Sequence, residues 1–181
     1  NIQDALIRLG IFKTLSLITT ISVSGVISPS KPAHNAIWRH SLETAYLCRY
    51  LAGSLPEFSV DKELAYLCGL LHDIGRFVML QISSKIIDVV DSRGWNTPVE
   101  LPAVEDKLFG FTHADVGYIA AKKWQLPETI TNVIQQHHQY DLWKKNEQSV
   151  EFRQLLTIVQ LADSISVLTQ VNPDWHDWSE T

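Results

Sequence analysis

The stretch Gly69-Leu70-Leu71-His72-Asp73-Ile74-Gly75 places a histidine and an aspartate at the end of an apolar run. Ionisable groups are costly to bury unless they find hydrogen bonds, an opposite charge or a metal ion. Histidine offers a nitrogen ligand and aspartate an oxygen ligand, and the two together suit divalent iron, manganese or zinc. A His-Asp pair alone is also compatible with a purely structural role, so its meaning depends on the residues that accompany it.

Several other polar residues stand at the ends of helical patterns or within apolar ones. An acid on an apolar helix face, such as Asp163 in Leu161-Ala162-Asp163, must be ion-paired, hydrogen-bonded or metal-bound. A salt bridge would explain Asp163 equally well if it were considered alone. As a set, these residues predict one metal-binding cluster. Its candidate ligands are His40, His72, Asp73, His113, His137, His138 and Asp163.

The chain reads as one all-α domain, because apolar residues recur with helical spacing and strand signals are sparse. We expect Asn35, Asp61 and Thr112 to be N-caps, with Asp115 completing a capping box at Thr112. Trp38 and Trp124 are expected in the core. Two short helices are predicted, one before and one after Arg93-Gly94-Trp95. The other predicted helices cover residues 2–9, 12–27, 36–52, 61–75, 112–124, 127–138 and 151–170. The domain spans residues 1–170, and residues 171–181 form a tail or the start of a linker.

Composition narrows the function classes. The 181 residues are 45% hydrophobic and 19% charged, which is typical of a globular chain. A net charge of −5 and the lack of a dense Lys/Arg run argue against nucleic acid as a partner. The apolar stretch 15–27 is too short and too polar to span a membrane. Cys48 and Cys68 are expected to be buried, reduced thiols, which favours a cytoplasmic location.

The order His40, His72-Asp73, Asp163 resembles the ligand pattern of the HD superfamily of metal-dependent phosphohydrolases. Within that superfamily the chain most resembles the HDOD domain, an output domain of bacterial signalling proteins. The resemblance covers residues 1–170. It is carried by Ala5 to Gly10, Trp38-Arg39-His40-Ser41, Gly69 to Gly75, Glu105 with Phe109-Gly110 and His113 to Gly117, Trp124-Gln125-Leu126-Pro127 and His137-His138.

The resemblance implies an HD-domain-like helical bundle with a regulatory role. The related HD-GYP domains hydrolyse cyclic di-GMP at a site of two or three metals, and their metal ligands match the seven candidates named above. Three positions depart from the HD-GYP pattern: Ala36 stands where a Glu precedes the first His, Arg76 replaces a Lys, and no Gly-Tyr-Pro follows His138. These departures put the phosphodiesterase activity in doubt, although a guanidinium at position 76 still suits a phosphate.

Three functions therefore remain open. The first is a regulatory domain with a retained metal cluster, whose partners are other signalling proteins or fused domains. The second is a metal-dependent phosphohydrolase acting on a cyclic dinucleotide or another nucleotide phosphate, with Asp73 and Arg76 as its catalytic residues. The third is a metal-free ligand-sensing pocket in which the histidines are hydrogen-bonded polar groups.

Overall fold

A computed structural model of the chain describes residues 32–141 and 148–171. Within these residues every regular element is a helix and no strand is present, which confirms the all-α class. The helices predicted at residues 2–9 and 12–27, and most of the tail, lie outside the described residues. The helices are α3 (Pro32–Ser54), α4 (Lys62–Leu71), α5 (Ile74–Ile82), α6 (Ser84–Ser92), α7 (Glu100–Phe109), α8 (His113–Lys123), α9 (Glu128–Gln136) and α10 (Val150–Val171).

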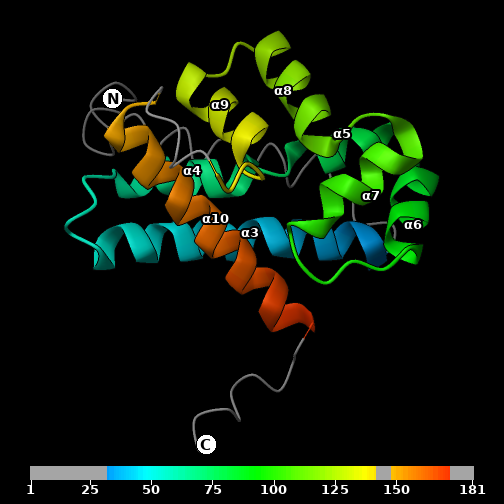
Figure 1. The fold of residues 1–181 in the computed structure, drawn as a ribbon, viewed down its shortest axis with the longest axis horizontal. Helices are drawn as coiled ribbons and strands as arrows, with labels where there is room; N and C mark the ends of the chain where they lie inside the picture. The colour runs from blue at the N-terminus through cyan, green and yellow to red at the C-terminus, as the bar shows by residue number, and fades with distance from the viewer. Residues whose placement is uncertain (1–31, 142–147, 172–181) are drawn as a thin grey trace, which may run out of the picture.

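The long helix α3 forms the base of the bundle, and α4 runs back along it (Figure 1). Helix α10 crosses both of these helices, α9 and α8 follow each other over α4 and α5, and α6 and α7 lie at the far end. Helix α4 contacts α3, α9 and α10, and α10 also contacts α3 and α9, so polar residues from distant parts of the sequence are brought together.

Helix starts were predicted well where a side chain caps the backbone. Asp61 accepts a hydrogen bond from the backbone N–H of Leu64, and Thr112 forms the predicted capping box with Asp115. The prediction for Asn35 was wrong, because α3 already begins at Pro32. The predicted core position of Trp124 was also wrong, since that residue is 54% exposed at the C-terminal end of α8, whereas Trp38 packs against the core.

The helix expected to continue to residue 75 ends at Leu71, and a new helix begins at Ile74. Asp73 leaves the helical conformation, with φ −96° and ψ 17°. This break turns the chain between α4 and α5, so His72 and Asp73 are presented at a corner rather than on a helix face.

Two glycines flank this corner at points of close helix approach. A Cβ atom at Gly75 would lie 1.8 Å from the carbonyl oxygen of His113, so the start of α5 packs directly on the backbone of α8. A Cβ atom at Gly69 would lie 2.7 Å from the Sγ atom of Cys48 and 2.9 Å from Cα of Ala45. The two glycines therefore let α4 approach α3 and α5 approach α8 closely enough to bring the ligands together.

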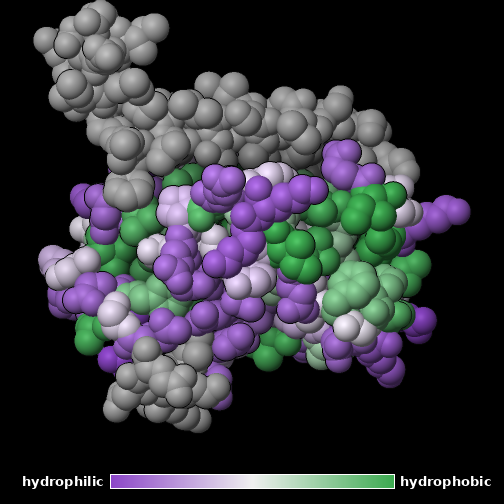
Figure 2. Space-filling view, turned by 90° about the horizontal axis from the view of Figure 1, so that it is seen from above, coloured by the Kyte–Doolittle hydropathy of each residue, from purple (hydrophilic) through white to green (hydrophobic). Residues whose placement is uncertain are grey.

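One main hydrophobic core runs through the bundle, with residues from α3, α4, α5, α6, α8, α9 and α10. In Figure 2, which views the molecule from above, the hydrophobic surface gathers toward the end that carries α5, α6 and α7 in Figure 1. Among the described residues, α10 is the one helix that is long and apolar enough to cross a membrane, and its mean hydropathy is only 1.2. It packs on α3 and α4 and carries the buried Asp163, as a core helix does.

Candidate metal centre

The structure brings all seven predicted ligands to one place. Five helices or helix junctions supply them: mid-α3, the α4–α5 corner, the first residue of α8, the residues after α9, and mid-α10. Six of the seven side chains are buried, and His138 is partly buried. In chain order these sources supply His40, then His72 and Asp73, then His113, then His137 and His138, and finally Asp163.

Asp73 lies at the centre of two groups of ligand atoms. One group contains Asp73, His113, His137 and His138, and the other contains Asp73, His40 and His72. Within each group the potential ligand atoms lie within 4.8 Å of one another. A carboxylate has two oxygens and can therefore serve both groups. The geometry is that of two adjacent cation positions that share one aspartate.

In the first group, the Oδ1 atom of Asp73 lies 3.1 Å from Nε2 of His113 and 3.6 Å from Nε2 of His137. The two histidine Nε2 atoms are 3.2 Å apart. His138 adds a third Nε2 atom, 2.9 Å from that of His113. Three ring nitrogens and a carboxylate oxygen thus surround one point.

In the second group, Nε2 of His40 lies 3.3 Å from Nε2 of His72 and 3.8 Å from Oδ2 of Asp73. Asp163 joins this group, because its Oδ1 atom lies 3.2 Å from Nε2 of His40 and 3.9 Å from Nε2 of His72. Its other oxygen, Oδ2, is buried and has no hydrogen-bond partner among the described residues. A cation bound by this second group would give that oxygen a partner.

The hydrogen bonds made by the Nδ1 atoms, which face away from Asp73, show which ring nitrogen is free to bind a metal. Nδ1 of His72 donates to the carbonyl oxygen of Gly69 at 2.7 Å, and Nδ1 of His137 donates to that of Ile134 at 2.8 Å. A carbonyl oxygen only accepts, so the proton is on Nδ1 and the lone pair of each neutral ring is on Nε2. Partners of this kind orient metal-ligating histidines in proteins.

His40 and His113 are held in the same way by side chains. Nδ1 of His40 donates to Oγ of Ser166 at 2.9 Å, and Ser166 in turn donates to a carboxylate oxygen of Glu43 at 3.0 Å. Nδ1 of His113 donates to Oε2 of Glu105 at 2.6 Å. The Nε2 atoms of all four rings therefore point inward, in pairs about 3 Å apart, and a cation bound between them would take the place of the protons they otherwise carry or share.

The charge and the space of the cluster also fit a cation. Asp73, Asp163 and Glu105 bring three buried carboxyl groups, whereas Arg76 is the one permanently charged base beside them in the described structure. A void of about 10 Å³ lies among the cluster residues, including His40 and His138. The residues therefore fit a divalent metal with mixed nitrogen and oxygen ligands.

The ionisation of the cluster follows from burial and neighbouring charge. Burial is the largest influence on His72 and lowers its pKa to about 4, against the opposing effect of Asp73 and Asp163. Burial also acts on His113, but the charges of Asp73 and Glu105 and their hydrogen bonds raise its pKa to about 10. Although burial opposes ionisation of Asp73, neighbouring histidines hold the pKa of this carboxyl well below its usual range. The centre therefore keeps its negative carboxylate near neutral pH.

Sequence reasoning did not identify Glu105 and Ser166 as site residues. Glu105 is completely buried, and Ser166 is 1% exposed. Two signals pointed to Glu105: it belongs to one of the motifs that carry the HDOD resemblance, and it follows Leu101 by four residues on the buried face of α7. Ser166 follows Asp163 by three residues and so lies on the same face of α10. Its polarity gives no indication of a histidine 126 residues away.

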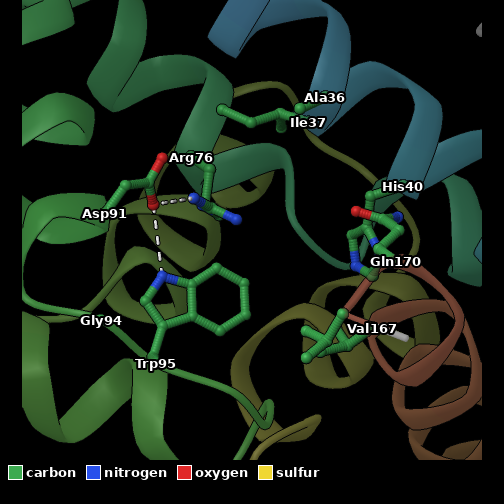
Figure 3. Close-up of a pocket in the computed structure, with 10 residues that line it drawn as sticks. Ala36, Ile37, His40, Arg76, Asp91, Gly94, Trp95, Val167 and Gln170 are labelled. Carbon is green, nitrogen blue, oxygen red and sulfur yellow. Dashed lines mark hydrogen bonds and ion pairs between the residues drawn. The ribbon is translucent and has the colours of Figure 1, made fainter. Parts of the chain in front are cut away.

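Arg76, the predicted phosphate ligand, is buried next to the centre. Its Nη1 atom lies 4.0 Å from Oδ2 of Asp73, and its Nη2 atom donates to Oδ1 of Asp91 at 3.2 Å. The guanidinium lies over the ring of Trp95, 5.3 Å from its centroid, and Trp95 also donates to Asp91. Figure 3 shows Arg76, Asp91 and Trp95 on one side of a cavity and His40, Val167 and Gln170 on the other.

Fold and site together define an all-helical domain of the HD type. The HDOD domain family matches residues 1–140, and the chain belongs to that family. An HDOD domain protein of unknown function from Geobacter sulfurreducens has the same fold, with a TM-score of 0.69 and 26% identity. That match covers 96% of this chain and 55% of the other.

The chain is also similar to a second solved structure and to curated protein sequences. A Shewanella amazonensis SB2B protein, provisionally named a phosphohydrolase, gives a TM-score of 0.68 at 22% identity, covering 98% of this chain and 64% of the other. An uncharacterized protein of Treponema pallidum (strain Nichols) is 27% identical over 76% of this chain and 27% of its own length. Ribonuclease Y of Lachnoclostridium phytofermentans is 30% identical over 71% of this chain and 17% of its own length. The chain thus spans less than a third of these curated relatives.

Proposed function

We propose that this chain is a regulatory domain of bacterial signal transduction that carries a dinuclear divalent-metal centre. The observation that carries the metal site is the convergence of the ring nitrogens on Asp73, with four of the rings fixed from behind by hydrogen bonds. His113, His137 and His138 would hold one ion, His40, His72 and Asp163 would hold the other, and Asp73 would be shared. Nitrogen and carboxylate ligands suit iron, manganese or zinc.

The regulatory role is supported by membership of the HDOD family and by the departures from the hydrolytic pattern. Ala36 is exposed on α3 and brings no carboxylate to the centre. We expect the domain to act in the cytoplasm on other signalling proteins or fused domains, with no role for nucleic acid. The ribonuclease Y similarity does not alter this proposal, because it covers only 17% of that protein.

Metal content tests the proposal directly. The chain, purified without chelator, is loaded with Mn²⁺ or, without oxygen, Fe²⁺, and its bound metal is counted by elemental analysis. Wild-type protein is expected to hold about two ions per chain, His40→Ala about one, and Asp73→Ala fewer than one, because Asp73 serves both groups. Asp88→Asn, a change of an exposed acid on α6, should leave the content unchanged. Wild-type protein without stoichiometric metal, or equal loss in all variants, would contradict the proposed centre.

A phosphohydrolase is the second candidate, and the cavity next to the centre favours it. Arg76 places a guanidinium at the wall of that cavity, where it could bind a phosphoryl oxygen, and Asp73 would hold the metal. When bound, a divalent ion supplies Lewis-acid polarisation of a phosphoryl oxygen.

Turnover distinguishes the two candidates. The metal-loaded chain is incubated with cyclic dinucleotides and with nucleoside phosphates, and phosphate-ester cleavage is measured. Cleavage that is lost in His72→Ala and retained in Asp88→Asn would favour the hydrolase. A metal-loaded chain that cleaves none of these compounds would favour the regulatory role.

A further inference from the structure

A cavity of about 300 Å³ adjoins the metal centre and is not part of the ligand cluster. His40, Trp95 and Val167 line both this cavity and the small void inside the cluster, so these three side chains form the boundary between the two spaces. A molecule in the cavity could thus reach one edge of the centre while most of it remained outside.

One side of the cavity is suited to an anionic oxygen. Arg76 is only 4% exposed, and its Nε atom is buried without a hydrogen-bond partner among the described residues. Asp91 takes only one of the five N–H donors of the guanidinium, which leaves others available. Figure 3 shows one end of the guanidinium at Asp91 and the other directed toward the middle of the cavity. Guanidinium groups bind phosphate with paired hydrogen bonds.

The rest of the lining is mainly apolar. Ile37 from α3 and Val167 from α10 lie across from the half-buried indole of Trp95, and Ala36 adds a small side chain at the α3 wall. Gln170 and Asp91 supply an amide and a carboxylate that can accept hydrogen bonds from hydroxyl or amino groups. An apolar chamber with a few fixed polar groups is the usual form of a small-molecule site.

We propose that this cavity binds a phosphate monoester of single-nucleotide size. The phosphate lies against Arg76 and the edge of the metal centre, and the flat, less polar part of the ligand lies between Trp95, Ile37 and Val167. This inference rests on the metal-binding function proposed above. The bound nucleotide is a substrate if the domain cleaves its phosphate ester, and a regulatory ligand if it does not.

Volume argues for one nucleotide rather than two. Small-molecule sites occupy about 300–1,000 Å³, so this cavity is at the lower limit of the range. A cyclic dinucleotide contains two bases and two sugars and needs roughly twice the space of a mononucleotide. We therefore expect the cyclic dinucleotide considered as a substrate from sequence to be excluded.

Binding to the Mn²⁺-loaded chain tests this inference, with adenosine 5′-monophosphate as the probe and phosphate release monitored in the same samples. We expect it to bind about tenfold more tightly than adenosine, inorganic phosphate or cyclic di-GMP. Equal affinity for inorganic phosphate, or tighter binding of cyclic di-GMP, would overturn the proposed ligand class.

Two substitutions locate the site. Ala36→Phe places a ring in the cavity and should weaken nucleotide binding about tenfold or more, whereas Asn35→Phe adds the same ring at the neighbouring exposed position and should not. Trp95→Ala should weaken the nucleotide about tenfold but leave inorganic phosphate unchanged. If Ala36→Phe and Trp95→Ala bind the nucleotide as wild type does, the cavity is not its site.

Metal analysis of the same samples separates the two proposals. Protein that holds no metal contradicts the proposed function and this inference together. Protein that holds about two ions but binds adenosine 5′-monophosphate no better than phosphate contradicts only the inference. Arg76→Lys keeps the buried positive charge and removes the planar fork, so it should weaken both phosphate-bearing probes while the metal content stays at the wild-type level.

Discussion

One carboxylate oxygen of Glu105 accepts two hydrogen bonds from His113, at 2.8 Å from its backbone nitrogen and at 2.6 Å from its Nδ1 atom. The same interaction fixes the first residue of α8 and turns the Nε2 atom of His113 toward Asp73. A residue eight positions earlier in the chain, with no contact to the proposed metal positions in either ligand group, therefore orients one of their ligands.

Glu105→Gln keeps the size of the side chain but removes its negative charge. We expect metal affinity to fall about 10–100-fold, which is the usual effect of losing the carboxylate behind a metal-ligating histidine. Competition with a chelator of known affinity measures the change. Asp106→Asn, at the next and exposed position of α7, is the matched control and should bind metal like wild type. Equal effects of the two substitutions would remove the argument for an orienting role.

The glycine that packs α5 on α8 should be among the least replaceable residues of the described structure. Gly75→Ala places a Cβ atom 1.8 Å from a backbone oxygen that no side-chain rotation can move, so we expect a loss of about 3 kcal/mol or more in unfolding free energy. At Gly117 the nearest atom is a side-chain methyl of Ile134 at 2.8 Å, which can shift, so Gly117→Ala should cost about 1–2 kcal/mol.

Urea unfolding of both variants measures these losses. Gly53→Ala is the control, because its new methyl group would meet only the flexible end of Lys62 and the substitution favours helix in the last turn of α3. It should leave stability unchanged or raise it by up to about 1 kcal/mol. A Gly75→Ala protein as stable as Gly53→Ala would show that the two helices are not in the close contact described here.

Metal binding should also stabilise the fold, since the ligands come from α3, α8, α9, α10 and the α4–α5 corner. At a free Mn²⁺ concentration of about 100 times Kd, the native state gains about 2.7 kcal/mol for each site occupied independently. Unfolding in urea with Mn²⁺ and with excess chelator measures the gain, and His137→Ala should show a smaller one. No difference between metal and chelator in the wild-type protein would mean that the native cluster does not bind the ion.

The sequence predicted the class of the fold and the residues of the cluster better than it predicted the helix boundaries and long-range contacts that bring those residues together. Helical periodicity and the side-chain caps at Asp61 and Thr112 are local signals, and both were found. The break at Asp73 was missed because apolar residues resume at Ile74, directly after His72-Asp73, so two polar residues alone marked the boundary between α4 and α5. The roles of Gly75 and Ser166 were missed because each depends on a contact with a residue far away in the chain, respectively His113 and His40.

Glu105 shows why a buried acid is hard to find by inspection. It stands beside Asp106 and Lys107 in a charged run that resembles a solvated helix face. That face becomes internal because α7 packs on α6 and α8, and the position of α8 depends on its packing against α5. Asp163 was easier to identify, since its neighbours on α10 are mostly apolar and an acid there is exceptional.

The two cysteines should be unreactive in the native chain. Cys48 and Cys68 are completely buried, and burial raises the pKa of both thiols above the ordinary value of 9.0. Because the thiolate is the reactive form, a disulfide reagent at pH 8 should modify neither thiol until the protein is unfolded, when both react. Rapid modification of the native protein would contradict the buried positions.

The same raised pKa values predict how stability depends on pH. The folded state retains the thiol protons that the unfolded state releases, so this contribution is fully present below about pH 9 and is lost as pH rises toward the folded pKa values. Each thiol should cost about 1.4 kcal/mol of unfolding free energy for each pH unit above its unfolded pKa. Urea unfolding at pH 8 and pH 10 should therefore show a smaller decline for Cys68→Ala than for wild type. An equal decline would mean that Cys68 ionises as readily in the folded chain as in the unfolded one.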